Sequence, residues 1–497
     1  MIKKILIANR SEIAVRIIKA CRQLGITSAV IYSDADITSI HTRLADESYY
    51  IGASPATESY LNKEKIIKLA KEINADAIHP GYGFFSENAS FIEDVEKNDL
   101  IFIGPSSKSV KMMGSKTAAR KLMSENNVPV VPGSVEAIKK LSEGIKLADE
   151  IGYPVLLKAS AGGGGKGMRK INSKDEFEPA FEATKREALK SFANDEVYLE
   201  KYIQNPRHIE VQIIADKFGN YRHLFERECS IQRRHQKIIE ESPSPFVDEK
   251  LRAKITNAAV NAAKACGYYN AGTIEFLVDK DKNFFFLEMN TRIQVEHPVT
   301  EMITGIDLVK EQIKIADDQN ISFEQDDLKI NGYAIESRIY AEDPANNFMP
   351  STGKILNYKE PTGYGIRVDS GFDEGSEISI HYDPMIAKLI CWDKDRLSAL
   401  EGAKRALSEF KVSGLITNIR FLFNLINMKE FTSGNYDINF LENLLKTNPD
   451  ICSDNFGNDL LEAAMIFSVL VKSQKLNLNN KQTLTKSENK WWEQNYE

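Results

Sequence analysis

Residues 288–297 read Glu-Met-Asn-Thr-Arg-Ile-Gln-Val-Glu-His and carry four charged or ionisable side chains and two amides. The apolar stretch Phe284-Phe285-Phe286-Leu287 comes directly before them and predicts the end of a buried strand. Because side chains alternate along a strand, we expect Glu288 and Asn290 on the same face. A segment this rich in polar groups is rarely part of a core.

A second strand is expected just upstream, at residues 272–278, and a short polar segment predicts a hairpin turn between the two. The turn is centred between Asp281 and Lys282. That register places Glu275 directly opposite Glu288. Opposed carboxylates repel each other on a sheet, so we expect a cation between them, and all-oxygen ligands favour Mg²⁺. The alternative is a solvated acidic edge, which is the commoner situation for two glutamates.

The composition indicates a soluble globular chain. Its 497 residues predict about three domains at ~150 residues each. The balance of 64 basic and 71 acidic residues gives a net charge of −7, which argues against nucleic acid as the main partner. Five cysteines without a Cys-x-x-Cys pair fit a reducing, cytoplasmic setting and indicate neither a zinc site nor disulfides. The start of the chain predicts neither a signal peptide nor a membrane span.

The first hundred residues predict an α/β domain. A strand at 5–8, a helix from Ser11 that stops at Gly25 and a strand at 29–32 form a βαβ unit. Its first turn lacks the Gly-x-Gly-x-x-Gly pattern, so dinucleotide binding there is weakly supported. A further helix at about 63–73, a strand near 76–78 and the loop 79–88 extend this domain to about residue 114.

A glycine tract, Gly162 to Met168, follows a predicted strand at 154–158. It formally satisfies Gly-x-Gly-x-x-Gly, but residues 168–171 continue as a strand where the Rossmann fingerprint requires a helix. We therefore interpret the tract as a mobile flap whose N–H groups close over phosphates. A plain flexible turn is the alternative.

Two further segments combine strand character with polar side chains. The strand predicted at 196–203 leads into polar backbone that could offer a hinge to an adenine ring. In residues 208–212, strict alternation places His208, Glu210 and Gln212 on one strand face. Downstream, three basic or amide residues near a strand end predict a rim facing an anion, namely Gln232, His235 and Lys237.

Taken together, residues 8–14, 79–88, 158–168 and 288–301 resemble the biotin carboxylases, which are ATP-grasp components of acetyl-CoA, propionyl-CoA and pyruvate carboxylases. The similarity spans about residues 1–446, and Gln294-Val295-Glu296-His297 is its most specific segment. The family more often has glycine at the position of Ser11, which affects only the local backbone.

The resemblance implies an α/β and α+β ATP-grasp fold of three domains. These are a Rossmann-like N-terminal domain at 1–114, an ATP-grasp domain at 115–330 with a hinged lid at about 131–203, and a β-rich C-terminal domain at 331–446. Residues 447–497 would form an extension, a helix followed by a polar tail. The helix expected at 460–471 either docks on its own chain, which we favour, or serves as a handle for a partner.

The resemblance also implies the site residues. ATP would be bound by Lys116, Lys158, Gly164, Gly165, Met168, Glu200, Lys201, Tyr202, Ile203, His208, Gln232, His235, Glu275 and Glu288. Two ions of Mg²⁺ or Mn²⁺ would be held by Glu275, Glu288 and Asn290. Bicarbonate and biotin would be bound by Lys237, Arg292, Gln294, Val295 and Arg338, and the catalytic set would be Arg292, Glu296, Lys237 and Arg338.

The implied chemistry begins with bicarbonate, a weak nucleophile that needs a base and cationic clamps. By resemblance, Glu296 removes its proton, carboxyphosphate forms and breaks down to CO₂ and phosphate, and Arg338 stabilises the biotin enolate. A carboxylate can accept this proton only if its pKa is raised, and burial or nearby anions could raise it.

No Met-Lys-Met segment of the biotin-attachment type occurs, so the biotin is expected on a separate carrier protein. Carboxyltransferase subunits and a second copy of the chain are the other expected partners. Acetyl-CoA carboxylase of fatty acid synthesis is the favoured holoenzyme, with propionyl-CoA or pyruvate carboxylase as the alternative. Two competing functions are another ATP-grasp ligase that does not need biotin and a non-catalytic ATP-binding module.

Overall fold

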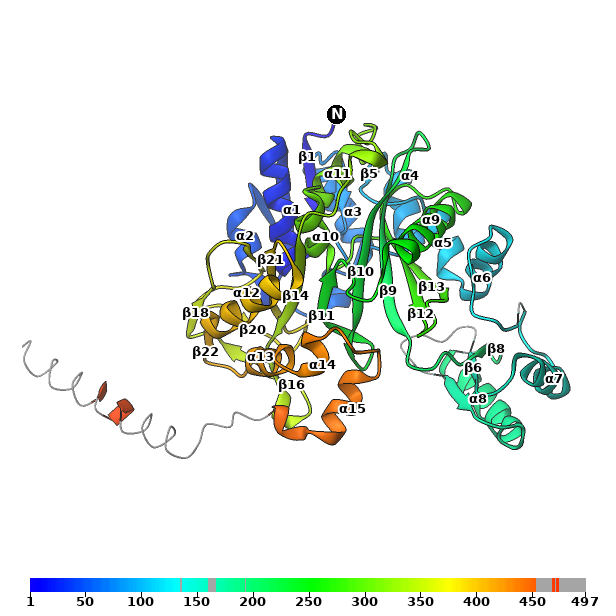
Figure 1. Cartoon of the computed structure of the whole chain (residues 1–497). Helices are drawn as coiled ribbons and strands as arrows, with labels where there is room; N and C mark the ends of the chain where they lie inside the picture. The colour runs from blue at the N-terminus through cyan, green and yellow to red at the C-terminus, as the bar shows by residue number, and fades with distance from the viewer. Residues whose placement is uncertain (135, 160–166, 193, 453–466, 470, 473–497) are drawn as a thin grey trace, which may run out of the picture. The chain divides into compact units, whose positions relative to one another are not determined.

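The computed structural model describes residues 1–134, 136–159, 167–192, 194–452, 467–469 and 471–472 (Figure 1). It divides into two units, Met1–Ile451 and Cys452–Glu497, which are treated separately. Of the second unit, residues 467–469 and 471–472 are helical, and the rest of the helix expected at 460–471 lies outside the described residues. None of the described helices is long and apolar enough to cross a membrane.

A parallel five-stranded sheet begins the first unit, in the order β3-β2-β1-β4-β5 (Figure 1). Its strands are β1 (Lys4–Ile7), β2 (Thr27–Ser33), β3 (Glu47–Gly52), β4 (Ala77–His79) and β5 (Ile101–Phe102). Its helices are α1 (Ser11–Leu24), α2 (Ile40–Leu44), α3 (Lys63–Glu72), α4 (Ala89–Lys97) and α5 (Ser107–Gly114). The predicted βαβ unit is confirmed, and Gly25 ends α1 in the left-handed conformation (φ 70°) that glycine adopts without strain.

The strand order of this sheet reverses between β1 and β4, the place where such sheets bind nucleotides. Here the side chain of Asn9 bonds from one side of this point to the other. The amide of Asn9 donates to the carbonyls of Pro80 at 2.6 Å and Tyr82 at 2.7 Å. The amide thereby ties the turn after β1 to the loop after β4.

An antiparallel eight-stranded sheet forms the centre of the first unit, in the order β13-β12-β9-β10-β11-β14-β21-β19. Its strands are β9 (Arg207–Ala215), β10 (Tyr221–Arg233), β11 (Gln236–Ser242), β12 (Asn270–Val278), β13 (Phe284–Asn290), β14 (Tyr333–Tyr340), β19 (Ile366–Ser370) and β21 (Met385–Asp393). The β11–β14 pairing carries this sheet across residue 330 without interruption.

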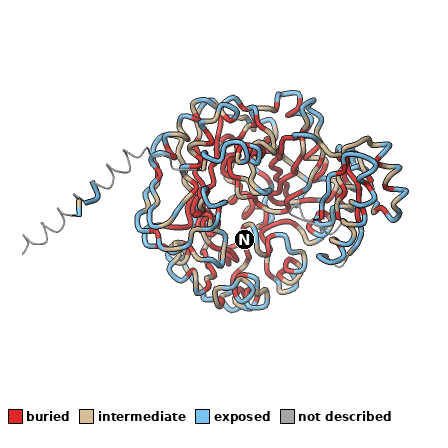
Figure 2. The backbone as a smooth tube through the Cα atoms, turned by 90° about the horizontal axis from the view of Figure 1, so that it is seen from below, coloured by how far each residue is buried: buried red, intermediate tan, exposed pale blue. Residues whose placement is uncertain are grey.

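The two faces of this sheet have different chemistry. The odd-numbered β9 side chains Ile209, Val211 and Ile213 share a core with helix α9 (Glu249–Ala265). The even-numbered His208, Glu210 and Gln212 project from the other face, as the alternation of a strand requires. All three are buried, and Figure 2 shows that buried segments occupy the interior of this unit.

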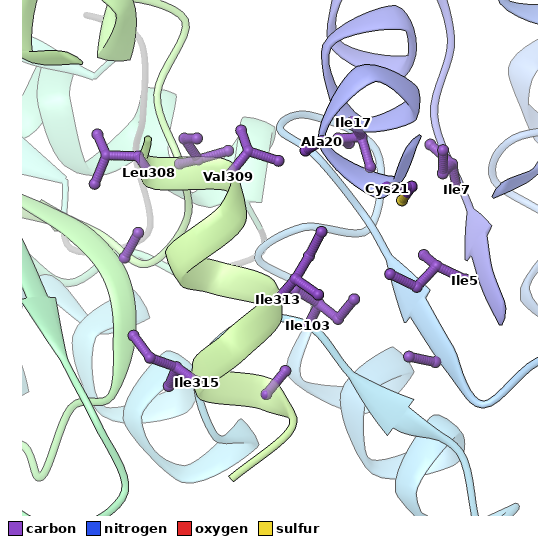
Figure 3. Close-up of a cluster of buried hydrophobic side chains, with 14 of the residues drawn as sticks. Ile5, Ile7, Ile17, Ala20, Cys21, Ile103, Leu308, Val309, Ile313 and Ile315 are labelled. Atoms are coloured by element: carbon purple, nitrogen blue, oxygen red, sulfur yellow. The ribbon is translucent and has the colours of Figure 1, made fainter. Parts of the chain in front are cut away.

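Helix α11 (Leu308–Ala316) joins the two sheets. Its Val309 and Ile313 belong to one buried cluster with Ile5 of β1 and Ile17 of α1 (Figure 3). The same cluster includes Ile214 of β9, so the first sheet is attached to the second through an apolar contact. Each such aliphatic side chain contributes about 1.5–3 kcal/mol when fully buried.

A three-stranded antiparallel sheet, β7-β6-β8, has a small core of its own. Its strands are β6 (Val155–Ala159), β7 (Met168–Ile171) and β8 (Val197–Lys201), and its helices are α7 (Leu141–Ile151) and α8 (Phe177–Phe192). This confirms that the glycine tract connects two strands, although residues 160–166 themselves lie outside the described residues.

The remaining elements lie before the central sheet, between its strands or after it. They include α6 (Lys116–Glu125), α10 (His297–Thr304), α12 (Arg396–Glu409), α13 (Ile419–Ile426), α14 (Lys429–Thr432) and α15 (Phe440–Thr447). The short strands are β15 (Glu342–Asp343), β16 (Met349–Pro350), β17 (Gly353–Lys354), β18 (Asn357–Lys359), β20 (Glu377–Ile378) and β22 (Lys411–Ser413). Helix α10 directly follows Glu296 and packs on β14 and β10, which places residues 291–296 over the polar face of the sheet.

Candidate active site

The β12–β13 hairpin provides the acidic part of the site, and the predicted pairing of Glu275 with Glu288 is confirmed. The predicted centre of the turn is wrong, because Val278 pairs with Phe284 and the turn is therefore centred on Asp281. Glu275 pairs with Glu288, and Thr273 pairs with Asn290. The register shifts by one residue beyond Glu275, where Phe276 pairs with Phe286, so Leu287 is a bulge. The bulge lets an apolar run end in a polar segment that faces the site.

Glu275 is the centre of a hydrogen-bond network. Its Oε1 accepts from the amides of Asn290 at 2.8 Å and Gln294 at 2.9 Å, and from Lys237 at 3.0 Å. Its Oε2 lies 2.9 Å from His208 Nε2. Burial would raise the pKa of Glu275, but the Lys237 and His208 charges lower it well below its usual range. Glu275 is therefore ionised.

Lys237 connects three carboxylates. Its Nζ lies 2.5 Å from Glu210, 3.0 Å from Glu275 and 2.6 Å from Glu296. Burial would lower the pKa of this ammonium, and the three acidic neighbours raise it well above its usual value. A cation surrounded in this way holds the acids of β9, β12 and the 291–296 segment around one point.

Glu296 accepts from two cations. Arg338 on β14 donates to Glu296 Oε2 at 3.0 Å, while Lys237 contacts Oε1. Burial would raise the pKa of Glu296, yet Lys237, Arg338 and Arg227 together lower it well below 4.5. The role expected for Glu296 from the sequence requires a raised pKa, which burial or nearby anions could supply. Burial does not supply it here, because Lys237 and Arg338 contact Glu296 itself.

Arg227 of β10 is fully buried beneath these residues and was not singled out from the sequence. It donates to Glu210 at 2.5 Å, to Gln212 at 2.7 Å and to Gln294 at 2.6 Å. It thereby joins the strand-face residues of β9 to the 291–296 segment. The only sequence signal for Arg227 is the high density of charged residues at 226–237. That density does not distinguish a buried arginine from an exposed one.

Arg292 contacts both the loop after β4 and the edge of this cluster. Its Nε donates to Glu87 at 3.0 Å, and its Nη2 donates to Asn290 at 3.0 Å. Glu87 also accepts from the Thr291 amide at 2.9 Å. Residue 292 is therefore held at the rim of the site, where Asn290 links it to Glu275.

Val295 contributes backbone groups only. Its carbonyl accepts at 2.9 Å from Lys388 of β21, whose side chain is 0% exposed. Lys388 also lies 3.2 Å from Glu12 of α1. The peptide between Val295 and Glu296 is thus held in place by a buried cation.

The predicted nucleotide residues lie on both sides of this network. Lys158 of β6 lies 2.5 Å from Glu200 of β8, and Glu200 also accepts from Arg120 of α6 at 2.8 Å. Lys116 begins α6, and desolvation and the Lys158 charge lower its pKa although Glu288 acts in the opposite direction. Four lysine and glutamate residues expected to bind ATP therefore interact with one another, namely Lys116, Lys158, Glu200 and Glu288.

The segment Lys201 to Ile203 lines a cavity of about 870 Å³ together with the turn after β12 and helix α15. Lys201 donates to the Gly152 carbonyl at 2.8 Å, and Lys170 lies over the Tyr202 ring at 4.3 Å. The hinge thus forms one wall of a cavity large enough for a nucleobase-sized ligand.

The other residues expected to bind the nucleotide differ in their exposure and surroundings. The amide nitrogen of Gln232 lies 2.8 Å from His208 Nδ1, and Gln232 pairs with Lys237 across β10 and β11. His235 is exposed in the turn between these strands, and Met168 is exposed at the start of β7. Gly164 and Gly165 lie outside the described residues.

The opposed carboxylates fit a divalent cation. Desolvation and the Glu275 charge raise the pKa of Glu288, although His208, Lys116 and Lys237 act in the opposite direction, and a cation between the two carboxylates would relieve their repulsion. Lys237 supplies positive charge next to Glu210, which makes that neighbourhood unsuitable for a metal. Glu275, Glu288 and Asn290 offer the oxygen donors that Mg²⁺ prefers.

Family models match this chain in three consecutive segments. They describe the biotin carboxylase N-terminal domain at residues 1–110, the carbamoyl-phosphate synthase L chain ATP binding domain at 115–323 and the biotin carboxylase C-terminal domain at 336–443. The chain is also 52% identical over 443 residues to biotin carboxylase 1 of Bacillus subtilis, which covers 89% of this chain and 98% of that protein. The chain belongs to the biotin carboxylase family.

Solved biotin carboxylase structures share its fold. The biotin carboxylase domain dimer of Hydrogenobacter thermophilus 2-oxoglutarate carboxylase, in complex with MgADP, ADP and bicarbonate, has 47% identity and a TM-score of 0.85. It covers 91% of this chain and 99% of that one. A biotin carboxylase complex from Campylobacter jejuni has 47% identity and a TM-score of 0.85, with 89% and 99% covered.

Relatives also occur as parts of longer chains. The methylcrotonoyl-CoA carboxylase subunit alpha of Dictyostelium discoideum is 51% identical over 441 residues, which are 88% of this chain and 63% of that protein. The family therefore serves carboxylases with different acceptors. The ATP-grasp fold and the biotin carboxylase assignment expected from the sequence are confirmed.

Proposed function

We propose that this biotin carboxylase uses ATP and bicarbonate to carboxylate biotin carried on a separate protein. The single observation behind the proposal is the bridging of Glu210, Glu275 and Glu296 by Lys237, with Arg338 on the other oxygen of Glu296. A pure binding module has no use for a buried base held by two cations. The titles of related structures name MgADP and bicarbonate as ligands of those proteins.

In this proposal Glu296 is the general base. The proton of bicarbonate moves to Glu296, a bicarbonate oxygen bonds to the γ-phosphorus of ATP, and the bond to ADP breaks. Glu296 has a low pKa before the anions arrive, so it is always ionised and ready to accept. Bound anions then interact with Lys237 and Arg338, so these two cations stabilise the Glu296 carboxylate less. The pKa of Glu296 therefore rises when it must accept the proton.

The cations around Glu296 have separate tasks. Lys237 and Arg292 bind bicarbonate with the help of the backbone around Gln294 and Val295, and Arg338 stabilises the biotin enolate. Carboxyphosphate, and then CO₂, carries the carboxyl group from the phosphorylation of bicarbonate to the carboxylation of biotin. Support for these tasks comes from the contacts of Lys237 and Arg338 with Glu296 and from the contact of Arg292 with Asn290.

For the nucleotide, Lys116, Lys158 and the flap glycines would bind the phosphates, and the hinge from Glu200 to Ile203 would bind the adenine. Glu275, Glu288 and Asn290 would hold Mg²⁺ or Mn²⁺, which supplies charge neutralisation of the phosphates when bound. His208, Gln232 and His235 would lie along the ribose side.

The test is ADP release measured with bicarbonate, with and without free biotin. We expect release to depend on bicarbonate and to rise when biotin is added. Bicarbonate-dependent release that ignores biotin would point to another ATP-grasp ligase. Nucleotide binding without turnover would identify a non-catalytic module.

For the holoenzyme we propose acetyl-CoA carboxylase, with propionyl-CoA or pyruvate carboxylase as the alternative. The support for this choice is a relative that is named only as a biotin carboxylase and is matched over 98% of its length. Partners copurified with the chain would be tested for ADP-coupled carboxylation of acetyl-CoA, propionyl-CoA, 3-methylcrotonoyl-CoA and pyruvate. A homodimer and a cytoplasmic location are part of the same proposal, and size measurement with light scattering tests the dimer.

A further inference from the structure

Two fully buried carboxylates lie side by side behind Arg338. Glu240 on β11 pairs directly with Glu336 on β14, and both residues are 0% exposed. Side chains at paired positions of neighbouring antiparallel strands project from the same face, with Cβ atoms ~5 Å apart. Neither residue was identified from the sequence.

Their hydrogen bonds differ. Arg338 donates from Nε to Glu240 Oε1 at 2.6 Å, and its Nη2 contacts the same oxygen. Within the described residues, Glu240 Oε2 and both oxygens of Glu336 accept no hydrogen bond. Glu240 thus holds the guanidinium from behind, while Glu296 accepts from Nη2 on the side of the site.

Two adjacent buried carboxylates cannot both be ionised at low cost, because each charge opposes the other in a medium of low dielectric constant. The charged groups that face the pair are Arg338, Lys237, Lys388 and Glu296. Of these, Arg338 bonds to Glu240, so the negative charge is stabilised there and the shared proton belongs on Glu336. In agreement, burial raises the pKa of Glu336 well above its usual value and that of Glu240 to about 7.

We propose that Glu240 is a positioning residue that aims the Arg338 guanidinium at Glu296 and the biotin side of the site, and that Glu336 keeps a proton so that Glu240 stays ionised. This inference rests on the proposed function for its kinetic part only. When Glu296 accepts a proton, Arg338 loses one anionic partner, and Glu240 keeps the guanidinium in place.

The first arm compares Glu240→Gln with Glu336→Gln, a matched pair of isosteric changes on facing strands. We expect Glu240→Gln to lower kcat of biotin-dependent ADP release about tenfold, the loss expected for one charge-assisted hydrogen bond. The KM for ATP should not change. Glu336→Gln should stay within about twofold of the unmodified protein, because an amide mimics a neutral acid. Glu240→Asp, which keeps the charge, should recover part of the lost kcat.

The pH profile separates positioning from a packing role. In the unmodified protein and in Glu336→Gln, kcat should fall below about pH 7 as Glu240 takes a proton and releases Arg338. In Glu240→Gln that acidic limb should be absent or displaced. An unchanged limb in Glu240→Gln, or a loss in Glu336→Gln as large as that in Glu240→Gln, would overturn the proposal.

A second arm does not depend on turnover. The infrared difference spectrum between the unmodified protein and Glu336→Gln at pH 8 should contain the carbonyl band of a protonated carboxylic acid. Its absence would show that Glu336 is ionised and would refute the proton assignment. If the band is present while ADP release ignores biotin, the proposed function fails and the carboxylate pair stands.

Discussion

The ammonium of Lys388 donates to the carbonyl of Val295 at 2.9 Å from a position with no exposed surface. These residues belong to a strand of the C-terminal segment and to the loop before α10. Lys388 also faces Glu12 of α1 at 3.2 Å, and burial raises the pKa of Glu12 to about 7. One cation therefore ties the first helix of the chain to the peptide proposed to bind bicarbonate.

Replacing Lys388 with Met should raise the KM for bicarbonate several-fold, because the Val295 peptide loses its fixed orientation. It should also destabilise the protein by about 3–5 kcal/mol, the cost of leaving one partner of a buried ion pair. The double change Lys388→Met with Glu12→Gln should recover much of the stability but not the KM. Lys394→Met, an exposed change on the following turn, is the control.

Glu296→Gln should abolish biotin-dependent ADP release while nucleotide binding remains. The amide keeps the size of the side chain but cannot accept the bicarbonate proton. Equilibrium binding of ATP and steady-state ADP release measure the two effects. Turnover at the rate of the unmodified protein would disprove the assignment of the base.

Glu288→Gln should increase the Mg²⁺ concentration needed for half-maximal activity by about tenfold, because one of two opposed carboxylates is removed. Asp281→Asn, in the turn of the same hairpin, should leave the Mg²⁺ titration unchanged. Coincident titrations for both variants and the unmodified protein would exclude Glu288 as a ligand.

Glu87→Gln should raise the KM for bicarbonate by up to about tenfold with little effect on the KM for ATP. Glu87 accepts from Arg292 and from the Thr291 amide, so its charge fixes the orientation of the arginine at the rim. Steady-state kinetics with varied bicarbonate provide the measurement. Glu93→Gln removes a carboxylate from a partly exposed ion pair on α4 and is the control. Equal KM values for Glu87→Gln and the control would contradict this role.

The stability of the N-terminal sheet should decline in mild acid. Burial lowers the pKa of His79 from 6.5 to about 3, and its Nδ1 accepts from the Gly81 amide at 3.1 Å. Between about pH 6.5 and 3 the unfolded chain binds a proton at this residue that the folded chain does not. The free energy of unfolding therefore falls as pH decreases, by at most about 1.4 kcal/mol per pH unit.

His79→Gln should remove this part of the pH dependence, and His381→Gln, an exposed histidine, should not. Thermal unfolding from pH 7.5 to 5 provides the comparison. Parallel curves for His79→Gln and the unmodified protein would show that His79 is not the titrating group.

Much of the fold could be predicted because local patterns decide it. Alternation along residues 272–290 and the polar turn between them fixed the facing of Glu275 and Glu288, apart from the bulge at Leu287. Gly25 and the apolar stripe after Ser11 similarly predicted α1. These features depend on neighbours within one or two elements.

The sequence did not predict the residues that act through contacts between distant strands. Examples are Arg227, Glu240 and Lys388, which lie on different strands of the central sheet. Local periodicity can predict a strand, but it does not predict the order of the strands in the sheet. The pKa of Glu296 was missed for the same reason, because its two cations come from β11 and β14. A resemblance identifies the groups that touch substrate, but not those that hold these groups in place.

The continuity of the central sheet through β11 and β14 has a practical consequence. Cutting the chain at residue 330, between two segments that match separate family models, would strip the hydrogen-bonding partner from one edge of β11. It would also leave Glu296, the proposed base, on one polypeptide and Arg338, which bonds to it, on another. Neither fragment should fold or work alone, so engineering that recombines such segments among relatives must exchange β11 and β14 as a matched set.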